Sequence, residues 1–404
     1  MTGIIKTDQI QGAQSTTVTI PSGTTLNVTT VSGTPTFSGD VTLPSIKGGQ
    51  IGGRRNIMIN GDMQVAQRGT SSTSTGFVTC DRFKTNKSGP DITTTQHALS
   101  TSDTPYSSGL RNSYQIHITD PQTPNAAVDY AEIAYTVESQ DMAQSGWDYT
   151  SASSKITLSF WVLSTVAGTY TVLLRNSDPN YAYTFNYTVS ADTWKKVTHT
   201  ISGNSNLVFN TDNGSGLAMF FTLYYGTNYT GTATNETWAA FDSNVQVGDY
   251  AQNILATDEA KFEITGVQLE VGSEATSFEH RSFGEELNLC RRYFTVLADG
   301  SEKINASICP GAYYTANILF HSVVLPVEMR TAPSMVTTNG TNYYQSFSNG
   351  SGDHHDAIAL GSAGTNRVVE IVAETNVAAT AGHATFTRLG GTNASAKCML
   401  DAEL

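Results

Sequence analysis

Hydrophobic and polar residues alternate along several stretches in the middle of the chain, and this alternation predicts β-strands. In KITLSFWVLST, one face carries Ile156, Leu158, Phe160 and Val162. The same two-residue period runs through GTYTVLLRN, YAYTFNYTV, GLAMFFTLYYG and KFEITGVQLEV. The Ala-Gly turn between KITLSFWVLST and GTYTVLLRN predicts a hairpin, and a change of phase at Gly266 predicts a β-bulge. Residues 54–283 are therefore expected to form an antiparallel β-sandwich of the jelly-roll type.

The first 53 residues follow a different pattern, in which very short alternating runs are separated by Gly, Pro and Ser turns. TTVTI, TLNVTT and TFSGDVTL each contribute one or two apolar residues, such as Val18, Ile20, Leu26 and Val28. One copy of such a segment cannot bury enough surface to offset the entropy that it loses on ordering. Three copies wound around one axis would cover one another's apolar residues, so residues 1–53 are predicted to form a short-stranded trimeric shaft. The alternative is a disordered Ser/Thr/Gly linker.

The one convincing helical pattern lies in FGEELNLCRRYF. Glu285 and Glu286 occupy its first turn, and Arg291 and Arg292 its last, which matches the helix macrodipole. The chain then returns to strand patterns in TANILFHSVVLPVEM, NRVVEIVAE, HATFTRLG and AKCMLDAEL. The prediction is an all-β protein in which one short helix separates the jelly roll from a smaller C-terminal β-sandwich within residues 284–404.

Composition and charge exclude several classes of protein. The chain has 404 residues, only 14% of them charged, and a formal net charge of -13. No apolar run approaches the roughly 20 residues that cross a bilayer, which argues against membrane insertion, and the first residues lack the layout of a secretory signal. The negative charge and the lack of a Lys/Arg cluster argue against a nucleic-acid partner. The four cysteines are far apart, which predicts buried free thiols at Cys80, Cys290, Cys309 and Cys398.

Four segments resemble parts of bacteriophage tail fibres and tail-associated host-recognition proteins. RRNIMINGDMQVAQRGTS (54–71) with CDRF (80–83) resembles the opening of a module in these proteins, and ITGVQLEVGSEATSFEHRSFGEELNLCRRYF (264–294) resembles its end. LPVEMRTAPS (325–334) is similar to a motif of the C-terminal domain that follows. MTGIIKTDQIQ resembles the N-terminal ends of fibre proteins from marine phages and cyanophages.

The resemblance implies a homotrimeric virion protein, part of a tail fibre or another surface appendage and assembled in the host cytoplasm. Its N-terminus would attach to other phage tail or virion proteins, and its distal β domains would bind host surface polysaccharide or lipopolysaccharide. No sugar-contacting residue carries over, because the middle of the chain does not align with the family residue by residue. From their chemistry alone, Arg68, Asp81 and Arg82 are expected to form an Arg-carboxylate clamp with charged residues near the last strand of the module, namely Glu270, Glu279, His280 and Arg281.

Aromatic residues beside Asn, Asp and Gln in predicted loops are candidates for carbohydrate binding. A sugar ring stacks on an aromatic face, while its hydroxyls need hydrogen-bond partners. The candidates are Trp147, Tyr149, Tyr181, Tyr229, Trp238, Tyr343 and Tyr344. The competing interpretation is packing at a trimer interface, where Tyr and Trp are also enriched.

Catalytic and metal-binding motifs give little support for an enzyme. The sequence has no G-x-S-x-G, H-E-x-x-H or P-loop, and its spacing selects no carboxylate pair for polysaccharide cleavage from Asp141, Asp148, Asp192, Asp212 and Asp242. Asp353-His354-His355-Asp356 is the one metal-like cluster, and an exposed polar turn is the simpler interpretation. We expect no catalytic residue, no metal site and no cofactor. The alternatives to a receptor-binding fibre are a purely structural virion decoration or connector and, third, a depolymerase.

Overall fold

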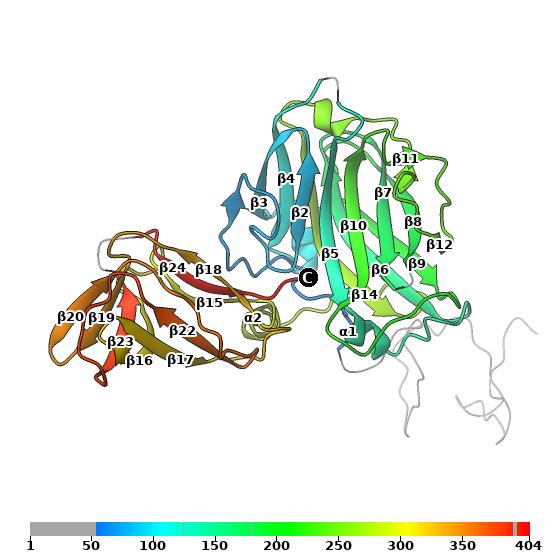
Figure 1. Ribbon diagram of the computed structural model, residues 1–404. Helices are drawn as coiled ribbons and strands as arrows, with labels where there is room; N and C mark the ends of the chain where they lie inside the picture. Colours follow the sequence, from blue (N-terminus) through cyan, green and yellow to red (C-terminus); the bar gives the residue numbers. More distant parts are fainter. Residues whose placement is uncertain (1–53, 124, 179, 391–393) are drawn as a thin grey trace, which may run out of the picture. The chain divides into compact units, whose positions relative to one another are not determined.

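The structure is a computed structural model that describes residues 54–404, except 124, 179 and 391–393 (Figure 1). The shaft predicted for residues 1–53 lies outside the described residues. The described part of the chain is almost entirely β-structure, as predicted. It also contains the helices α1 (Ser139–Ala143) and α2 (Phe283–Arg291) and two 3-10 turns, at Thr104–Ser108 and Ile254–Ala256. Of these helices, α2 was predicted and α1 was not.

Two antiparallel six-stranded sheets form the first sandwich. The β14 sheet runs in the order β1 (Ser71–Ser72), β3 (Asp91–Ala98), β4 (Asn112–Asp120), β14 (Lys261–Val271), β6 (Lys155–Ser164) and β9 (Lys195–Ser202). The β10 sheet runs in the order β12 (Ala239–Ala240), β8 (Tyr181–Val189), β7 (Gly168–Asn176), β10 (Ser215–Tyr225), β5 (Tyr130–Glu138) and β2 (Lys84–Ser88). A separate parallel pair consists of β11 (Thr230–Gly231) and β13 (Val247–Gly248).

Apolar side chains from the two six-stranded sheets meet in one core. Phe160 of β6 lies edge-to-face against Tyr187 of β8 and Phe221 of β10, with ring centroids 5.4 and 5.0 Å apart. The alternating residues that the sequence placed on one face of each strand are buried here. The predicted jelly-roll sandwich is confirmed.

The predicted hairpin between β6 and β7 is wrong. β6 pairs with β14 and β9, whereas β7 pairs with β8 and β10, so the turn between β6 and β7 carries the chain from one sheet to the other. The hairpin is formed by β7 and β8. Either arrangement gives each strand one buried face, and local alternation therefore could not distinguish them.

The predicted bulge at Gly266 is confirmed. The register between β14 and β6 shifts between Thr265 and Gln268, and Gly266 adopts a φ of 60°. A Cβ at this position would lie 2.7 Å from Cδ1 of Leu110. Both the left-handed backbone and the close contact favour glycine.

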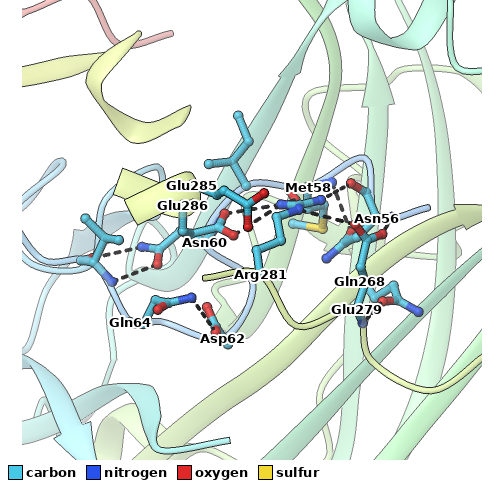
Figure 2. A network of polar contacts seen from close by, with 12 residues as sticks. Asn56, Met58, Asn60, Asp62, Gln64, Gln268, Glu279, Arg281, Glu285 and Glu286 are labelled. Atoms are coloured by element: carbon cyan, nitrogen blue, oxygen red, sulfur yellow. Dashed lines mark hydrogen bonds and ion pairs between the residues drawn. The ribbon is translucent and has the colours of Figure 1, made fainter. Parts of the chain in front are cut away.

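The two phage-like motifs of the first sandwich meet in a largely buried polar network (Figure 2). The side chain of Asn56 donates to the carbonyl oxygen of Val267 at 3.1 Å and accepts from the backbone N–H of Leu269 at 3.1 Å. Arg281 donates to the backbone carbonyls of Met58 and Asn56. Polar residues of both motifs thus hold the segment around Asn56 against β14, the last strand of the first sandwich.

Carboxylates of the second motif complete this network. Glu286 forms an ion pair with Arg281 at 3.2 Å and accepts a hydrogen bond from the backbone N–H of Asn60. Glu279 accepts from the backbone N–H groups of Arg55 and Asn56, each at 2.6 Å. Arg281 thus forms ion pairs with Glu279 and Glu286 of its own motif, and this cluster contacts the opening motif through backbone groups rather than through the predicted Arg-carboxylate pairs.

The residues after α2 form a second, smaller β-sandwich. Its three-stranded sheet contains β15 (Phe294–Asp299), β24 (Lys397–Asp401) and β18 (Ser334–Thr338). Its seven-stranded sheet runs β20 (Ser351–His355), β19 (Tyr344–Ser348), β23 (Ala384–Leu389), β16 (Ser307–Thr315), β17 (Ile318–Val324), β22 (Val368–Ala373) and β21 (Ala359–Leu360). The two sheets share a core that includes Cys398, Leu400, Tyr313, Leu319 and Ile371. The boundaries proposed at residues 53 and 283 stay predictions.

The seven-stranded sheet carries apolar side chains on its outer side as well. Val324 is 76% exposed and Tyr314 72% exposed, and Phe386 stacks on Phe347 with centroids 5.1 Å apart. Strand alternation and register place the members of this outer apolar face on one side of the sheet, namely Pro310, Ala312, Tyr314, Phe320, Val324, Phe347, Val368, Val372 and Phe386. The same register places Ser322 and Glu370 on this side, between the Phe320–Val372 and Val324–Val368 pairs. Exposed apolar side chains gathered in this way are typical of interaction sites.

Arg68 and Arg82 do not pair with the residues that the sequence analysis assigned to them. Arg68 forms ion pairs with Asp401 at 2.9 Å and Glu403 at 3.3 Å, and Arg82 pairs with Glu403. Asp401 is the last residue of β24 and Glu403 follows it, more than 300 positions along the chain from both arginines. The motif that opens the first sandwich therefore also anchors the chain's last residues. All four cysteines are buried, as predicted.

Candidate functional site

The outer side of the β10 sheet is the face that carries a candidate binding site. On β10, Met219, Phe221 and Leu223 belong to the core, so Phe220 and Thr222 point away from it. The same alternation brings neighbouring side chains of β2, β5 and β7 to this outer side. Figure 1 shows these strands next to one another in the first sandwich.

A hollow of about 320 Å³ lies on this face. We call it the first hollow, and it is lined by Tyr130, Glu132, Arg175, Phe220, Tyr225, Tyr229, Phe241, Ser243 and Gln246. The rings of Tyr130, Tyr225 and Tyr229 meet edge-to-face, with centroids 5.8 or 5.9 Å apart. Such mutual contacts hold the rings in fixed orientations.

Two further hollows adjoin the first one. The second hollow, about 230 Å³, shares Arg175 and Phe220 with it and also includes Lys84 and Asn86. The third hollow, about 220 Å³, shares Phe241 and Gln246 with the first and is otherwise lined mostly by small residues. We refer to the three hollows together as the sheet groove.

Glu132 is the buried carboxylate of the first hollow. It accepts hydrogen bonds from the hydroxyl of Tyr225 and, at 2.7 Å, from the side-chain amide of Asn86. Burial raises the pKa of Glu132 above its ordinary value, and the same burial, together with Glu132, raises the pKa of Tyr225. Both oxygens of Glu132 thus have partners, and the residue fixes Tyr225 in place.

Of the seven aromatic residues proposed from the sequence, Tyr229 lines the groove. Trp147, Trp238 and Tyr344 are buried, with exposed fractions of 3%, 6% and 0%. Trp238 donates its indole N–H to the carbonyl of Ser202, and the hydroxyl of Tyr344 donates to the carbonyls of Thr338 and Lys397. Their rings pack in the cores, so they offer no open face to a sugar.

The other three candidates are half-buried and lie outside the groove. Tyr149 packs edge-to-face on Phe209 with centroids 4.8 Å apart, and Tyr181 packs against the core of the first sandwich. Tyr343 packs against the core of the second sandwich. The structure thus does not bring the seven residues together.

The sequence analysis missed most of the groove. Tyr130, Arg175, Phe220 and Phe241 come from separate segments and meet only through strand register. A local signal existed at Phe220, since GLAMFFTLYYG has an aromatic residue where strict alternation expects a polar one. An exposed aromatic residue in the polar phase of a strand marks a surface that differs from an ordinary solvated face.

Two other hollows lie outside the sheet groove. The larger of these two, about 510 Å³, is lined in part by Arg54 and Arg55, but Arg281 and Arg292 in its wall are already paired with Glu286 and Glu138. Another, about 350 Å³, lies against β6 and β14 and is lined in part by Trp161, Lys196, Phe278 and His280. Its lining includes fewer aromatic rings than that of the sheet groove, and it is a second candidate site to test.

The Asp353–Asp356 cluster is part of β20 and its end, not the exposed turn that we expected. His355 is fully buried against Tyr344, and His354 contacts the side chain of Gln345. The two imidazoles lie on opposite faces of β20, because successive side chains of a strand point to alternate faces. Within residues 54–404, excluding the gaps noted above, no group of three His, Cys, Asp or Glu side chains is arranged to hold a metal ion.

No protein-family model matches the sequence, and no curated protein matches it. Among solved structures, the enzymatically active domain of tailspike protein 4 from bacteriophage CBA120 is 9% identical with a TM-score of 0.29, over 54% of this chain and 21% of that one. The N-terminal cellulose-binding domain of Cellulomonas fimi β-1,4-glucanase C is 8% identical with a TM-score of 0.26, over 52% and 99%. A family 11 carbohydrate-binding module from Clostridium thermocellum is 11% identical with a TM-score of 0.25, over 52% and 98%. At these TM-scores the likenesses carry no weight in the proposals that follow.

Proposed function

We propose that the chain is a homotrimeric fibre protein of a bacteriophage virion that binds host-surface glycans in the sheet groove. The observation that carries the binding part is the set of oriented, partly open aromatic rings in the first hollow, beside polar groups of Arg175, Ser243 and Gln246. A pyranose ring stacks on such faces while its hydroxyls pair with the polar groups. The fibre part rests on the motifs at 54–71, 80–83, 264–294 and 325–334.

Attachment through residues 1–53 and trimer formation belong to the same proposal. The outer apolar face of the second sandwich supports association, because Val324 and Tyr314 would otherwise stay in water. Three copies would also multiply a modest affinity for each glycan site through avidity. Location in the virion is tested by finding the protein in purified particles.

The binding part is tested with the full chain on susceptible host cells and on their extracted lipopolysaccharide. Tyr229→Ala and Phe241→Ala are each expected to weaken binding per chain by about 1 kcal/mol, roughly fivefold, because each removes one stacking surface. Tyr106→Ala is the matched control, since its half-buried ring stacks with Arg111 at 3.8 Å outside the groove. Binding of the wild-type chain to no susceptible host would contradict the proposal.

Two other outcomes would change the proposed site or the proposed activity. A loss in Trp161→Ala with no loss in Tyr229→Ala would move the glycan site to the hollow on the β14 sheet. Release of reducing ends from host polysaccharide would point to a depolymerase. A purely structural connector predicts that the groove is covered by neighbouring subunits in the assembled particle, whereas a receptor-binding fibre leaves it open to solvent.

A further inference from the structure

Building on the proposed function, we infer that the glycan of the sheet groove is acidic, and that Arg175 and Lys84 bind its carboxylate, sulfate or phosphate groups. The inference concerns the charge of the ligand, which the aromatic rings alone do not determine. It rests on the position, partners and rigidity of these two cationic side chains.

Arg175 is held in place without using up its outer donors. Its Nε donates to Oδ1 of Asn180 at 2.7 Å, and its guanidinium lies 4.0 Å from the ring centre of Phe241. Phe241 in turn donates its backbone N–H to the carbonyl of Asn180 at 3.0 Å. The three residues therefore fix the plane of the guanidinium, and a fixed guanidinium binds an oxyanion with two parallel hydrogen bonds at little entropic cost.

Neither cation has an acidic partner in the protein. Within the described residues, Arg175 and Lys84 take part in no ion pair, and the Lys84 ammonium lies 5.7 Å from the centre of the Phe77 ring. By contrast, Arg68, Arg82, Arg281 and Arg292 are all paired with carboxylates. In a chain of net charge -13, two unpaired cations in one groove call for an anionic ligand.

The carboxylates near the groove do not neutralise these cations. Glu132 is buried and hydrogen-bonded to Tyr225 and Asn86; burial raises its pKa, and the charge of Lys84 opposes this shift in part without forming an ion pair. Asp242 lines the third hollow, where its Oδ1 accepts from the backbone N–H of Asn244 at 2.8 Å. Leu404 also lines the second hollow, and no ion pair links it to Lys84 or Arg175.

The spacing of the two cations suits a polymer with repeated acidic groups. Lys84 lies on β2 and Arg175 on β7, and the strands β5 and β10 lie between them. Three strand spacings separate their backbones by about 14 Å. Phe220 of β10 lies between the two cations and lines both hollows. One polysaccharide chain crossing the strands can thus place sugar rings on the aromatic residues and acidic groups at either side.

The test is a binding assay of the full chain on a panel of purified polysaccharides. The acidic members are polygalacturonate, alginate and a sulfated galactan, and each is compared with its carboxyl-reduced or desulfated form, together with lipopolysaccharide before and after removal of phosphate. We expect the acidic forms to bind at least about tenfold more tightly than their neutral counterparts. We also expect binding to weaken as the salt concentration rises from about 50 to about 500 mM, because salt screens the attraction between exposed charges.

Substitutions of Arg175 distinguish the contribution of its positive charge from that of the two parallel donors of its guanidinium. Arg175→Gln is expected to lose about tenfold in affinity for the acidic forms and clearly less for the neutral forms, which lose one neutral hydrogen-bond partner, and Arg175→Lys is expected to restore part of the loss for the acidic forms. Arg111→Gln is the matched control, because Arg111 also stacks on an aromatic ring but lies outside the groove. Equal binding of acidic and neutral forms, or no effect of Arg175→Gln, would overturn the inference and leave glycan binding intact. Binding to no member of the panel and to no host cell would overturn both.

Discussion

The guanidinium of Arg82 lies 3.4 Å from the centre of the Tyr293 ring. Arg82 is only 1% exposed, and it also forms an ion pair with Glu403 and donates to the carbonyl of Thr136 at 2.6 Å. One arginine of the CDRF motif therefore links β5, the residue that precedes β15, and the last residues of the chain. Its charge is buried, so its energetic role depends on the carboxylate of Glu403.

Removing the carboxylate of Glu403 should lower the free energy of unfolding strongly. Glu403→Gln leaves the charge of Arg82 buried without its counterion, and we expect the free energy of unfolding to fall by about 3 to 5 kcal/mol in urea titrations. The control is Glu328→Gln, because Glu328 pairs with Arg367 where both side chains are exposed, at 43% and 72%. This control should cost at most about 1 kcal/mol. Similar losses in both variants would show that the Arg82 pair contributes no more than a surface pair.

This pair shows what the sequence could not supply. Charged partners for Arg82 were expected from the sequence, but among residues near β14, such as Glu270 and Glu279. The actual partner lies 321 positions away, after β24. Many carboxylates are compatible with one arginine on charge alone, and the choice is made only by the packing of the second sandwich against the first.

The bulge at Gly266 was predicted locally and gives a sharp mutational test. Gly266→Ala should lower the free energy of unfolding by roughly 1 to 3 kcal/mol, because Ala is strained at a φ of 60° and its Cβ would lie 2.7 Å from Leu110 Cδ1. Gly284→Ala is the control in α2, where nothing lies within 4 Å of an added Cβ. The control should be neutral or stabilising by up to about 1 kcal/mol. Thermal unfolding measures both, and an unaffected Gly266→Ala variant would contradict the packing described for β14.

Two histidines of the second sandwich lie in one buried hydrogen-bond chain. His321 contacts the hydroxyl of Thr387 at 3.0 Å, Thr387 contacts Ser346 at 2.6 Å, and Ser346 contacts Nε2 of His355 at 2.8 Å. Burial, with the neighbouring His321, lowers the pKa of His355 from 6.5 to about 4. Burial also lowers the pKa of His321. Both imidazoles are therefore neutral in the folded protein at pH 7.

The depressed pKa makes stability depend on pH with a defined sign. The unfolded chain binds a proton at His355 near pH 6.5, but the folded chain does so only near pH 4, so stability is complete above pH 6.5 and falls as the pH drops towards 4. The full difference corresponds to roughly 3 kcal/mol. Urea titrations at several pH values should show a smaller loss for His355→Gln than for the wild type.

A neighbouring histidine provides the control for this pH effect. His354→Gln changes an exposed side chain of the same strand and should leave the pH dependence unchanged. Burial also raises the pKa of Asp81 to about 6, which acts in the opposite direction, but this residue is the same in all three proteins. If His355→Gln and the wild type lost the same stability between pH 7 and pH 4, His355 would not be the titrating group.

The sheet groove shows a second limit of local sequence patterns. Alternation predicted β7, β8 and β14 with the bounds that the structure gives them, because a strand with one buried face repeats every two residues. Aromatic residues beside polar ones were the signal for candidate sites; Tyr229 lines the sheet groove, whereas Trp147 and Trp238, in equally polar surroundings, turn inward. Whether an aromatic ring in such a segment faces the core or solvent depends on which strands pair, and strand pairing is non-local.

The outer apolar face gives the last prediction, on the homotrimer. Val324 is 76% exposed and pairs across the sheet with Val368, so Val324→Glu adds a charge at the surface without disturbing the core. If copies of the chain associate through this face, three glutamates would be brought into an apolar contact, and burying unpaired charge is strongly unfavourable. Light scattering should then show three chains for the wild type and one for Val324→Glu, with unchanged circular dichroism.

Thr338→Glu, on β18 of the other sheet, is the control and should remain trimeric. A wild-type mass of one chain would contradict the homotrimer, and a trimeric Val324→Glu would place the contacts on another surface.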